Sequence, residues 1–506
     1  MIDWAVATSF EQAAKNVRSD SFGDWYRDPW GWPENEWVAT KAPHILTARL
    51  NNRGAKRALP IDVPKENFIL RPATLLDPID RIAYQALVDS LSNDLIGSMR
   101  DFVFGWRLPF RNPTKGFYAR NSSQWQGFRD ALLDFGDSHQ YGLATDITSF
   151  FQSVSIERLE QEVCQKVKRN SVIERLFDYL RSWDAIPSRG GLPQRCLASS
   201  VLAQFYLQPV DDVLALRSEK AHGLNAGQIT SCRWMDDIWV FSDEWSALRE
   251  VQLALQKCLW DVSLHLNGGK TQLREEDELR AAVREYEHSA ADFGLLFDDS
   301  GPLEELVGLV LADPANSSRT TIRFITSRMR RYDLDIEIEG FIQTANRLPH
   351  GSDHLARLFR DLETWRELEE WYLEYLNGPS GKIIWSAYQL GTMFPSSEKS
   401  NAICDYFANG LSKGELPTVM LPLAAQRLAA WIPDIRKGLI QELARAGTYD
   451  HPFSLRALAF AGTQVGVPIG TVKTLLQQFD ETLPQLALLE SRAFKPLPVA
   501  EDFAGD

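Results

Sequence analysis

The sequence lacks several features that would assign it to a protein class at once. Its 506 residues contain no apolar run long enough for a membrane span. Its five cysteines are odd in number and form no CxxC pair or Cys/His cluster, so neither a disulfide framework nor a zinc site is indicated. The opening MIDWAVATSFEQAAK lacks the basic and apolar regions of a signal peptide. We therefore expect a protein of the reducing cytoplasm with no membrane partner.

An excess of positive charge is also absent, because 68 Asp and Glu outnumber 54 Lys and Arg and the net charge is −14. This excludes a protein coated with nucleic acid over its whole surface but leaves room for a local basic channel. One segment alternates cations with aromatic rings, which suits phosphates beside bases. It contains Arg100, Arg107, Arg111, Lys115, Arg120, Arg129, Phe102, Phe104, Trp106, Phe110, Phe117, Tyr118 and Trp125. Arg107, Arg111 and Lys115 are our candidate nucleic-acid contacts, and a snorkelling mixed surface explains the pattern equally well.

The length exceeds one ordinary core and predicts two to four domains. Residues 1–140 mix short helical patterns with turn-rich connections. Residues 141–275 alternate predicted strands, at 141–147 and 231–241, with predicted helices, including one long buried helix over 197–216, and predict an α+β domain. Residues 276–506 show almost only helical periodicity, which favours an all-α, solenoid-like or HEAT-like domain although no fixed repeat period is visible.

Acidic residues interrupt the two predicted strands. Asp146 ends the apolar YGLAT, and Asp236-Asp237 lies within CRWMDDIWVF. Adjacent strand residues face opposite sides of a sheet, so we predict a tight turn at Asp236-Asp237 between two short strands. A hairpin tip beside the Asp146 strand would gather three carboxylates into an oxygen site of the kind Mg²⁺ prefers. Taken alone, an acidic pair is more often a simple turn or cap.

Further motifs accompany these acids in a defined order. They are Arg71-Pro72 with Asp80-Arg81-Ile82 and Gln85-Ala86-Leu87; Phe104-Gly105-Trp106-Arg107; Asp146-Ile147-Thr148-Ser149-Phe150-Phe151; Gly191-Leu192-Pro193-Gln194 with Ser199, Leu202-Ala203 and Tyr206-Leu207-Gln208-Pro209-Val210-Asp211; Trp234-Met235-Asp236-Asp237; and Leu264-His265-Leu266-Asn267-Gly268-Gly269-Lys270-Thr271. Any one of them is ambiguous, but the ordered set resembles reverse transcriptases of the prokaryotic, group-II-intron-related type over residues 60–275.

The resemblance implies a right-hand polymerase fold. Residues 1–140 would form an N-terminal extension and fingers, 141–275 a palm with an antiparallel sheet, and 276–506 a thumb-like and helical-repeat domain. It implies an RNA-directed DNA polymerase that joins dNTPs with two Mg²⁺ ions, Mn²⁺ being the alternative metal. Its partners would be an RNA template or a bound non-coding RNA, the DNA product and, as for many helical-repeat proteins, further copies of the chain.

The resemblance also assigns roles to individual residues. Asp146, Asp236 and Asp237 would bind the metals and catalyse the reaction together with Lys270, which would protonate or neutralise the leaving pyrophosphate. Ile147 would be a further metal ligand and nucleotide contact. Phe151 would exclude a 2′-hydroxyl, although one of Phe150 and Phe151 is expected to belong to the core. Gln194 would contact the incoming dNTP, and Lys65 and Arg71 would bind its triphosphate.

Two departures from the family pattern concern the nucleotide and the primer. Arg195 follows Pro-Gln where the family usually has glycine, and Trp234 replaces the usual Tyr or Phe at a position that supports the primer end. Both put ordinary primer–template extension in doubt. The three carboxylates are intact, so a catalytically inactive RNA-binding scaffold is the less favoured alternative.

The helical tail resembles that of the abortive-infection and other phage-defence reverse transcriptases more than the mobility domains of intron enzymes. Some of those relatives start DNA synthesis on a protein hydroxyl without a template. A conventional RNA-templated enzyme of a retron or orphan mobile element is the alternative. Within the tail, residues 316–332 predict a helix with a basic stripe along the product path, from which we take Arg323 and Arg330 as nucleic-acid contacts. A solvated face paired with nearby acids explains the stripe equally well.

Overall fold

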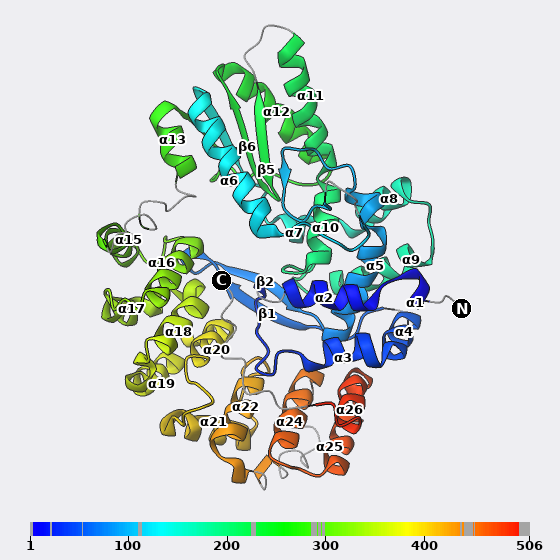
Figure 1. Cartoon of the computed structure of the whole chain (residues 1–506), viewed down its shortest axis with the longest axis vertical. Helices are drawn as coiled ribbons and strands as arrows, with labels where there is room; N and C mark the ends of the chain where they lie inside the picture. The colour runs from blue at the N-terminus through cyan, green and yellow to red at the C-terminus, as the bar shows by residue number, and fades with distance from the viewer. Residues whose placement is uncertain are drawn as a thin grey trace. The chain divides into compact units, whose positions relative to one another are not determined.

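The structure is a computed structural model that describes residues 4–20, 23–52, 54–109, 114–223, 229–284, 291, 295, 299–435, 438, 439, 449 and 451–494. The chain divides into two compact units (Figure 1). Unit 1 contains Met1–Gly23, Ala42–Ala55 and Asp80–His288, and unit 2 contains Asp24–Lys41, Lys56–Ile79 and Ser289–Asp506. The division into 1–140, 141–275 and 276–506 remains a prediction, and the two units cut across its first part.

Unit 1 combines helices with one five-stranded sheet. Its helices are α1 (Trp4–Ala7), α2 (Phe10–Asp20), α4 (Pro43–Asn51), α5 (Pro78–Ile96, whose first two residues belong to unit 2), α6 (Asn121–Ser138), α7 (Phe150–Ser153), α8 (Ile156–Lys166), α9 (Ser171–Asp184), α10 (Leu197–Tyr206), α11 (Gln208–Gly223), α12 (Trp245–Asp261) and α13 (Glu276–Arg284). Its strands are β3 (Val103–Phe104), β4 (Tyr141–Thr145), β5 (Thr230–Trp234), β6 (Asp237–Ser242) and β7 (Gln272–Glu275).

The sheet has the order β3-β5-β6-β4-β7. Its first pair, β3 with β5, is parallel and the other pairs are antiparallel. β4, β5 and β6 form where the sequence carries β-branched and aromatic residues. The long predicted strand over 231–241 is two strands, β5 and β6, joined by a turn at Met235 and Asp236. We expected that turn one residue later, at Asp236-Asp237.

Helices cover both faces of the sheet. Trp239 and Phe241 of β6, with Ala144 of β4, pack in one apolar cluster with Leu132 of α6 and Leu279 of α13. Alternate residues of the strands face the other side, where α12 packs on β4 and β6. Figure 1 shows α6 and α12 beside β5 and β6. This double cover explains why the four residues of β6 from Ile238 to Phe241 are all apolar.

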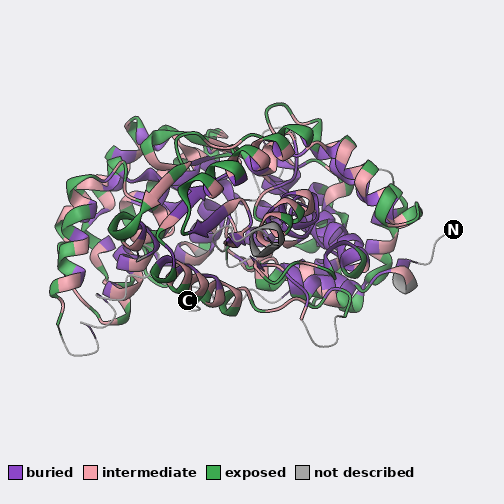
Figure 2. Ribbon diagram, turned by 90° about the horizontal axis from the view of Figure 1, so that it is seen from above, coloured by how far each residue is buried: buried purple, intermediate pink, exposed green. Residues whose placement is uncertain are grey.

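The predicted long helix over 197–216 is divided in two. α10 ends at Tyr206 and α11 begins at Gln208, because Pro209 has no N–H to donate to a continuing helix and fits the first turn of a new one. Buried and exposed residues alternate along most helices (Figure 2), as amphipathic helices require.

Unit 2 consists of helices and a two-stranded antiparallel sheet of β1 (Leu59–Pro64) and β2 (Leu70–Leu75). Its helices are α3 (Pro33–Lys41), α15 (Gly301–Ala312), α16 (Arg319–Arg331), α17 (Ile338–Thr344), α18 (Ser352–Asp361), α19 (Glu369–Asn377), α20 (Ile384–Gly391), α21 (Asn401–Lys413), α22 (Leu421–Trp431), α24 (Pro452–Gln464), α25 (Ile469–Leu476) and α26 (Leu483–Glu490). Its 3-10 helices are η2 (Glu66–Phe68), η3 (Ala345–Arg347), η4 (Pro349–Gly351), η5 (Thr364–Glu367), η6 (Ser380–Lys382), η7 (Pro433–Ile435) and η8 (Asp480–Thr482).

An early segment of the chain completes the core of unit 2. The Trp25 carbonyl oxygen accepts hydrogen bonds from Trp385 Nε1 at 2.6 Å and from Gln389 Nε2 at 2.9 Å. Tyr26 stacks on Tyr388 with ring centroids 4.5 Å apart. These contacts bridge more than 350 residues of sequence, so local pattern alone does not assign residues 24–41 to the same unit as the C-terminal helices.

Candidate active site

Strand register brings the predicted carboxylates together in unit 1. β4 pairs with β6 so that Thr145 lies opposite Ile238, and β5 pairs with β6 so that Trp234 lies opposite Asp237. Asp146, the residue after β4, therefore lies at the level of Asp237, the first residue of β6. Asp236 occupies the connecting turn. The sequence-predicted gathering of the three acids follows from this register.

The environment of Asp237 shows that the three carboxylates are close enough to interact. Burial, which has the largest effect, and the negative charges of Asp236 and Asp146 together raise the pKa of Asp237 to about 7, although the positive charge of Lys270 opposes the rise. Asp146 is itself buried. A cation would relieve this mutual repulsion, which is the electrostatic signature of a metal or cation site.

Lys270 supplies a cation at this site. Its Nζ lies 2.5 Å from Oδ2 of Asp146. Burial lowers the pKa of Lys270, but the hydrogen bond to Asp146 and the charges of Asp146, Asp237 and Asp236 outweigh it and raise that pKa. The ammonium therefore stays protonated at neutral pH, as a group that donates a proton to a leaving phosphate must.

Asn267, which we had not singled out as a functional residue, holds the loop that carries Lys270. Its N–H donates to the Asp146 carbonyl oxygen at 2.7 Å, and its own carbonyl oxygen accepts from the N–H groups of Lys270 and Thr271 at 3.0 and 2.9 Å. The hydroxyls of Thr271 and Thr145 lie 2.7 Å apart. The Leu–x–Leu–Asn–x–x–Lys–Thr spacing was the available signal, because it places the asparagine one turn before the lysine.

The donor set fits a hard divalent cation. It offers carboxylate oxygens from Asp146, Asp236 and Asp237, and the carbonyl of Ile147 follows Asp146 directly. With Lys270 bound to Asp146, no group of three or more His, Cys, Asp or Glu side chains within the described ranges is close enough to hold a metal ion. The carboxylates would therefore have to converge around an ion, with Lys270 released from Asp146 Oδ2.

A comparison with known protein families indicates which kind of domain contains this site. Residues 63–289 match the family model described as Reverse transcriptase (RNA-dependent DNA polymerase). These residues form a reverse transcriptase domain. The protein is accordingly an RNA-directed DNA polymerase, a nucleotidyltransferase, and the domain implies a polymerase palm, dNTP substrates and a nucleic-acid template. No curated protein matches the chain.

Two of the sequence motifs touch within the reverse transcriptase domain. Leu192 N–H donates to the Phe151 carbonyl oxygen at 2.8 Å, and Gly191 N–H donates to Oδ1 of Asp184 at 2.7 Å. Gly191 has φ +78°, and a Cβ there would collide with the Phe151 carbonyl oxygen. The Gly-Leu-Pro-Gln motif therefore needs glycine at this position for close backbone approach.

Phe151 and Gln194, which we predicted from the sequence as nucleotide contacts, are both partly exposed beside this junction. Phe150 is buried, and its ring centroid lies 5.4 Å from that of Phe151. Of the two phenylalanines, Phe150 is thus the core residue. Ile147 is also buried and pairs with Leu266. Its apolar side chain offers no metal ligand, so the ligand predicted at this position would be its main-chain carbonyl oxygen.

Arg195, where the family usually has glycine, keeps the backbone conformation that glycine favours. Its φ is +56°, in the left-handed region that L-residues adopt at a cost. The side chain is exposed, and the carbonyl oxygen accepts from Nη2 of Arg81 at 3.0 Å. The departure changes the side chain and leaves the local backbone path in place.

Trp234 belongs to an aromatic cluster next to the turn that carries Asp236. Its ring centroid lies 4.9 Å from that of Trp125 and 5.3 Å from that of Trp106. Gly105, at φ +80°, leaves room for the Trp234 ring, 3.3 Å from the position that a Cβ would take. The larger aromatic residue is thus accommodated by packing within the domain.

The predicted nucleic-acid contacts of unit 1 lie in different environments. Arg107 is buried, and its Nη1 donates to the Val103 carbonyl oxygen at 3.0 Å, which gives it a structural task. Lys115 is exposed. Arg111 lies outside the described residues.

The remaining predicted residues belong to unit 2. Arg71 lies over the ring of Trp25 at 5.3 Å, and Lys65 is partly exposed at the β1–β2 connection. On α16, Arg323 is exposed, whereas Arg330 Nε donates to Oδ2 of Asp361 at 2.6 Å. Arg330 thus has an acidic partner, but one farther along the chain than the acids that the sequence offered nearby.

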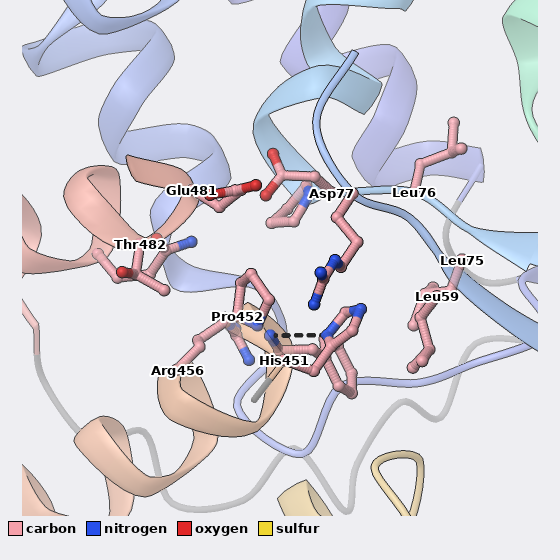
Figure 3. A pocket seen from close by; sticks show the side chains of 13 residues that line it. Leu59, Leu75, Leu76, Asp77, His451, Pro452, Arg456, Glu481 and Thr482 are labelled. Atoms are coloured by element: carbon pink, nitrogen blue, oxygen red, sulfur yellow. Dashed lines mark hydrogen bonds between the residues drawn. The ribbon is translucent and has the colours of Figure 1, made fainter. Parts of the chain in front are cut away.

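Unit 2 contains a pocket, which Figure 3 shows with His451, Arg456, Asp77 and Glu481 among its lining residues. Its most buried cation, Arg456, is engaged by Asp28 and Glu34. The pocket therefore presents no assembled set of catalytic groups comparable to that around Asp146. No helix among the described residues has the length and apolarity to cross a membrane.

Proposed function

We propose that the reverse transcriptase domain joins dNTPs by two-metal catalysis at Asp146, Asp236 and Asp237. The observation that carries this proposal is the β4–β6 register, which sets Asp146 beside Asp237 with Lys270 in contact. Two Mg²⁺ ions, or Mn²⁺ in their place, would activate the attacking hydroxyl and stabilise the charge of the leaving pyrophosphate. Asp146, Asp236 and Asp237, with the Ile147 carbonyl, would hold them.

The chain's own residues would then divide the remaining work. Lys270, freed from Asp146, would donate its proton to the pyrophosphate oxygen as the bond to the α-phosphorus breaks. Phe151 would stack under the sugar and exclude a 2′-hydroxyl, and Gln194 would contact the incoming nucleotide. Lys65 and Arg71 would neutralise its triphosphate, while Arg111, Lys115, Arg323 and Arg330 would contact nucleic acid.

We further infer a role in bacterial anti-phage defence, with synthesis that starts on a protein hydroxyl or proceeds without a template. The support is the helical region, most of which lies outside the family match. Consecutive helices α21, α22, α24, α25 and α26 each pack on the next, an arrangement compatible with a HEAT-like repeat region. A homo-oligomer, a bound non-coding RNA and a cytoplasmic location belong to the same proposal.

The test is polymerisation by the purified protein in Mg²⁺ with labelled dNTPs or NTPs and no added primer or template. The Asp236→Ala/Asp237→Ala double variant is the control. Product that forms from dNTPs alone and stays with the protein until protease is added would support protein priming. Product that requires an RNA and a primer would instead favour a conventional retron-like or orphan enzyme. Inactivity under both conditions, equal to the control, would leave an RNA-binding scaffold.

A further inference from the structure

One buried arginine joins the catalytic hairpin to a helix behind it. Arg233 in β5 is fully buried, and Asp211 in α11 is almost fully buried. Arg233 Nε and Nη2 donate to Oδ1 and Oδ2 of Asp211, both at 2.7 Å. Its third contact is main chain, because Nη1 donates to the carbonyl oxygen of Met235 at 2.7 Å. Met235 directly precedes the acidic pair Asp236-Asp237.

Both ends of this link are fixed within unit 1. Asp211 lies in the first turn of α11, where Gln208 Nε2 also donates to the Leu95 carbonyl oxygen at 2.6 Å. The main chain of Arg233 is held in the sheet, since its N–H donates to the Phe102 carbonyl oxygen at 2.9 Å. A planar guanidinium bound at three points between such anchors has little freedom to move.

The turn that it touches needs support. Met235 has φ +55°, a left-handed conformation that a non-glycine residue does not favour. Two adjacent carboxylates follow it and a third, that of Asp146, lies close, so electrostatic repulsion acts to spread the turn. A charged donor on the Met235 carbonyl oxygen opposes both tendencies, because it stabilises one orientation of the Met235–Asp236 peptide.

We propose that Arg233, oriented by Asp211, is a positioning residue that sets Asp236 and Asp237 for metal binding. This inference rests on the proposed metal role of those two carboxylates. A purely structural ion pair would need only the bidentate contact with Asp211. The third donor goes to the peptide from which the catalytic acids extend.

A second buried pair in unit 1 provides the matched control. Arg49 Nη1 lies 2.7 Å from Oδ1 of Asp80, and both side chains are as well buried as the Arg233–Asp211 pair. The hydrogen bond between them joins α4 to α5. Arg49→Lys and Arg233→Lys therefore remove the same planar fork from comparable surroundings, and only the second removes it from the catalytic hairpin.

The experiment compares Mn²⁺ binding, followed by the loss of the free-ion electron paramagnetic resonance signal, in the wild type, Arg233→Lys and Arg49→Lys. We expect Arg233→Lys to weaken binding about 10- to 100-fold, as loss of an outer-shell partner does, and Arg49→Lys to leave it unchanged. In metal-free protein, hydrogen exchange over residues 230–242 should quicken in Arg233→Lys alone. Equal Mn²⁺ affinity and equal exchange in the two variants would overturn the proposal.

Two further variants keep the test decisive. If Arg233→Lys does not fold, Asp211→Asn retains one acceptor for the guanidinium and should weaken Mn²⁺ binding by a smaller factor; unchanged binding would contradict the proposal. Asp236→Asn in the otherwise native protein tests the underlying assumption. If Asp236→Asn does not weaken Mn²⁺ binding, the proposed metal site has failed, and the positioning role fails with it for that separate reason.

Discussion

Arg233 in unit 1 and Arg456 in unit 2 are both fully buried, and the two arginines are used differently. In unit 1, Arg233 binds one carboxylate, that of Asp211, and one main-chain carbonyl at the catalytic turn. In unit 2, Arg456 binds two carboxylates, at 2.6 Å to Asp28 and 2.6 Å to Glu34, and lies 4.5 Å from the ring centroids of both Trp32 and Phe460. All four of these contacts of Arg456 are with side chains.

The difference separates two uses of a buried charge. Arg456 ties residues 24–41 to α24, hundreds of residues later, and contributes to the assembly of unit 2. Arg233 adds a constraint on a strained turn that carries functional groups. A buried ion pair is weak evidence for stability, so the groups that it touches beyond its partner are the better guide to its role.

The largest expected effect comes from removing the cation of unit 2. Arg456→Met leaves Asp28 and Glu34 buried without compensation, so the free energy of unfolding should fall by about 3–5 kcal/mol. Chemical denaturation measures it, with Arg366→Met, an exposed arginine paired with Glu398, as a control without measurable loss. The Mg²⁺ dependence of polymerisation by the folded fraction should not change. A shift in that dependence would break the distinction between the two arginines.

The opposite combination is expected at Lys270, where activity should change more than stability. Lys270→Ala should lower the rate of dNTP incorporation about 10²-fold, because a proton donor to the leaving group is lost. Its ion pair with Asp146 is largely exposed on the lysine side, so stability should change little. Lys257→Ala, an exposed lysine of α12 in the same unit, is the control. Equal rates for the two variants would remove Lys270 from the reaction.

A smaller, pH-dependent effect is expected at a third buried charge, Asp89 of α5. Burial raises the pKa of Asp89 from 3.8 to about 7, although Tyr118, Gln85 and Asn16 donate hydrogen bonds to it. The folded protein thus binds this proton more tightly than the unfolded chain, so stability is lost as pH rises from about 4 to about 7.

Asp89→Asn removes the titrating carboxyl group, and with it this pH-dependent contribution to the free energy of unfolding. Between about pH 5 and about pH 8, the wild type should lose about 2 kcal/mol relative to the variant. Unfolding of both proteins at the two pH values measures the difference, and any constant effect of the lost hydrogen bonds cancels. If the difference in unfolding free energy between the two proteins does not change with pH, the hydrogen bonds from Tyr118, Gln85 and Asn16 keep the Asp89 carboxylate ionised throughout this range.

The smallest expected effect concerns the backbone at Arg195. Arg195→Gly relieves a left-handed conformation and should raise the free energy of unfolding by about 0.5–1 kcal/mol after the entropy of glycine is included. Ser188→Gly, at φ +62° in the same unit, is the matched variant. A gain at Ser188 without a gain at Arg195 would show that the arginine side chain itself stabilises the domain.

Much of unit 1 was predictable from sequence because its signals are local. The YGLAT strand and the hairpin that carries Asp236 and Asp237 follow from alternation, apolar runs and turn residues. The three carboxylates could be expected to meet because both acidic sites end short strands. The turn lies one residue earlier than predicted, since Asp237 still pairs with Trp234.

Other features depend on contacts that no local pattern encodes. The burial of Arg107 and the pairing of Arg330 with Asp361 arise from neighbours brought close by folding. The same holds for residues 24–41, whose partners Trp385 and Tyr388 lie more than 350 positions away. The contacts of Arg233 were equally unpredictable from the sequence, because its partner Asp211 lies on another element and its third acceptor is a main-chain oxygen.

The central claim is that Asp146 and its neighbours catalyse nucleotide transfer. The most direct test is incorporation of labelled dNTPs in Mg²⁺, with and without an RNA template and primer, by the wild type and by Asp146→Asn. Asparagine keeps the size of the side chain but loses its charge, so the fold should persist by circular dichroism while the rate falls about 10³-fold or more. A folded Asp146→Asn protein that incorporates dNTPs at the wild-type rate would contradict the account.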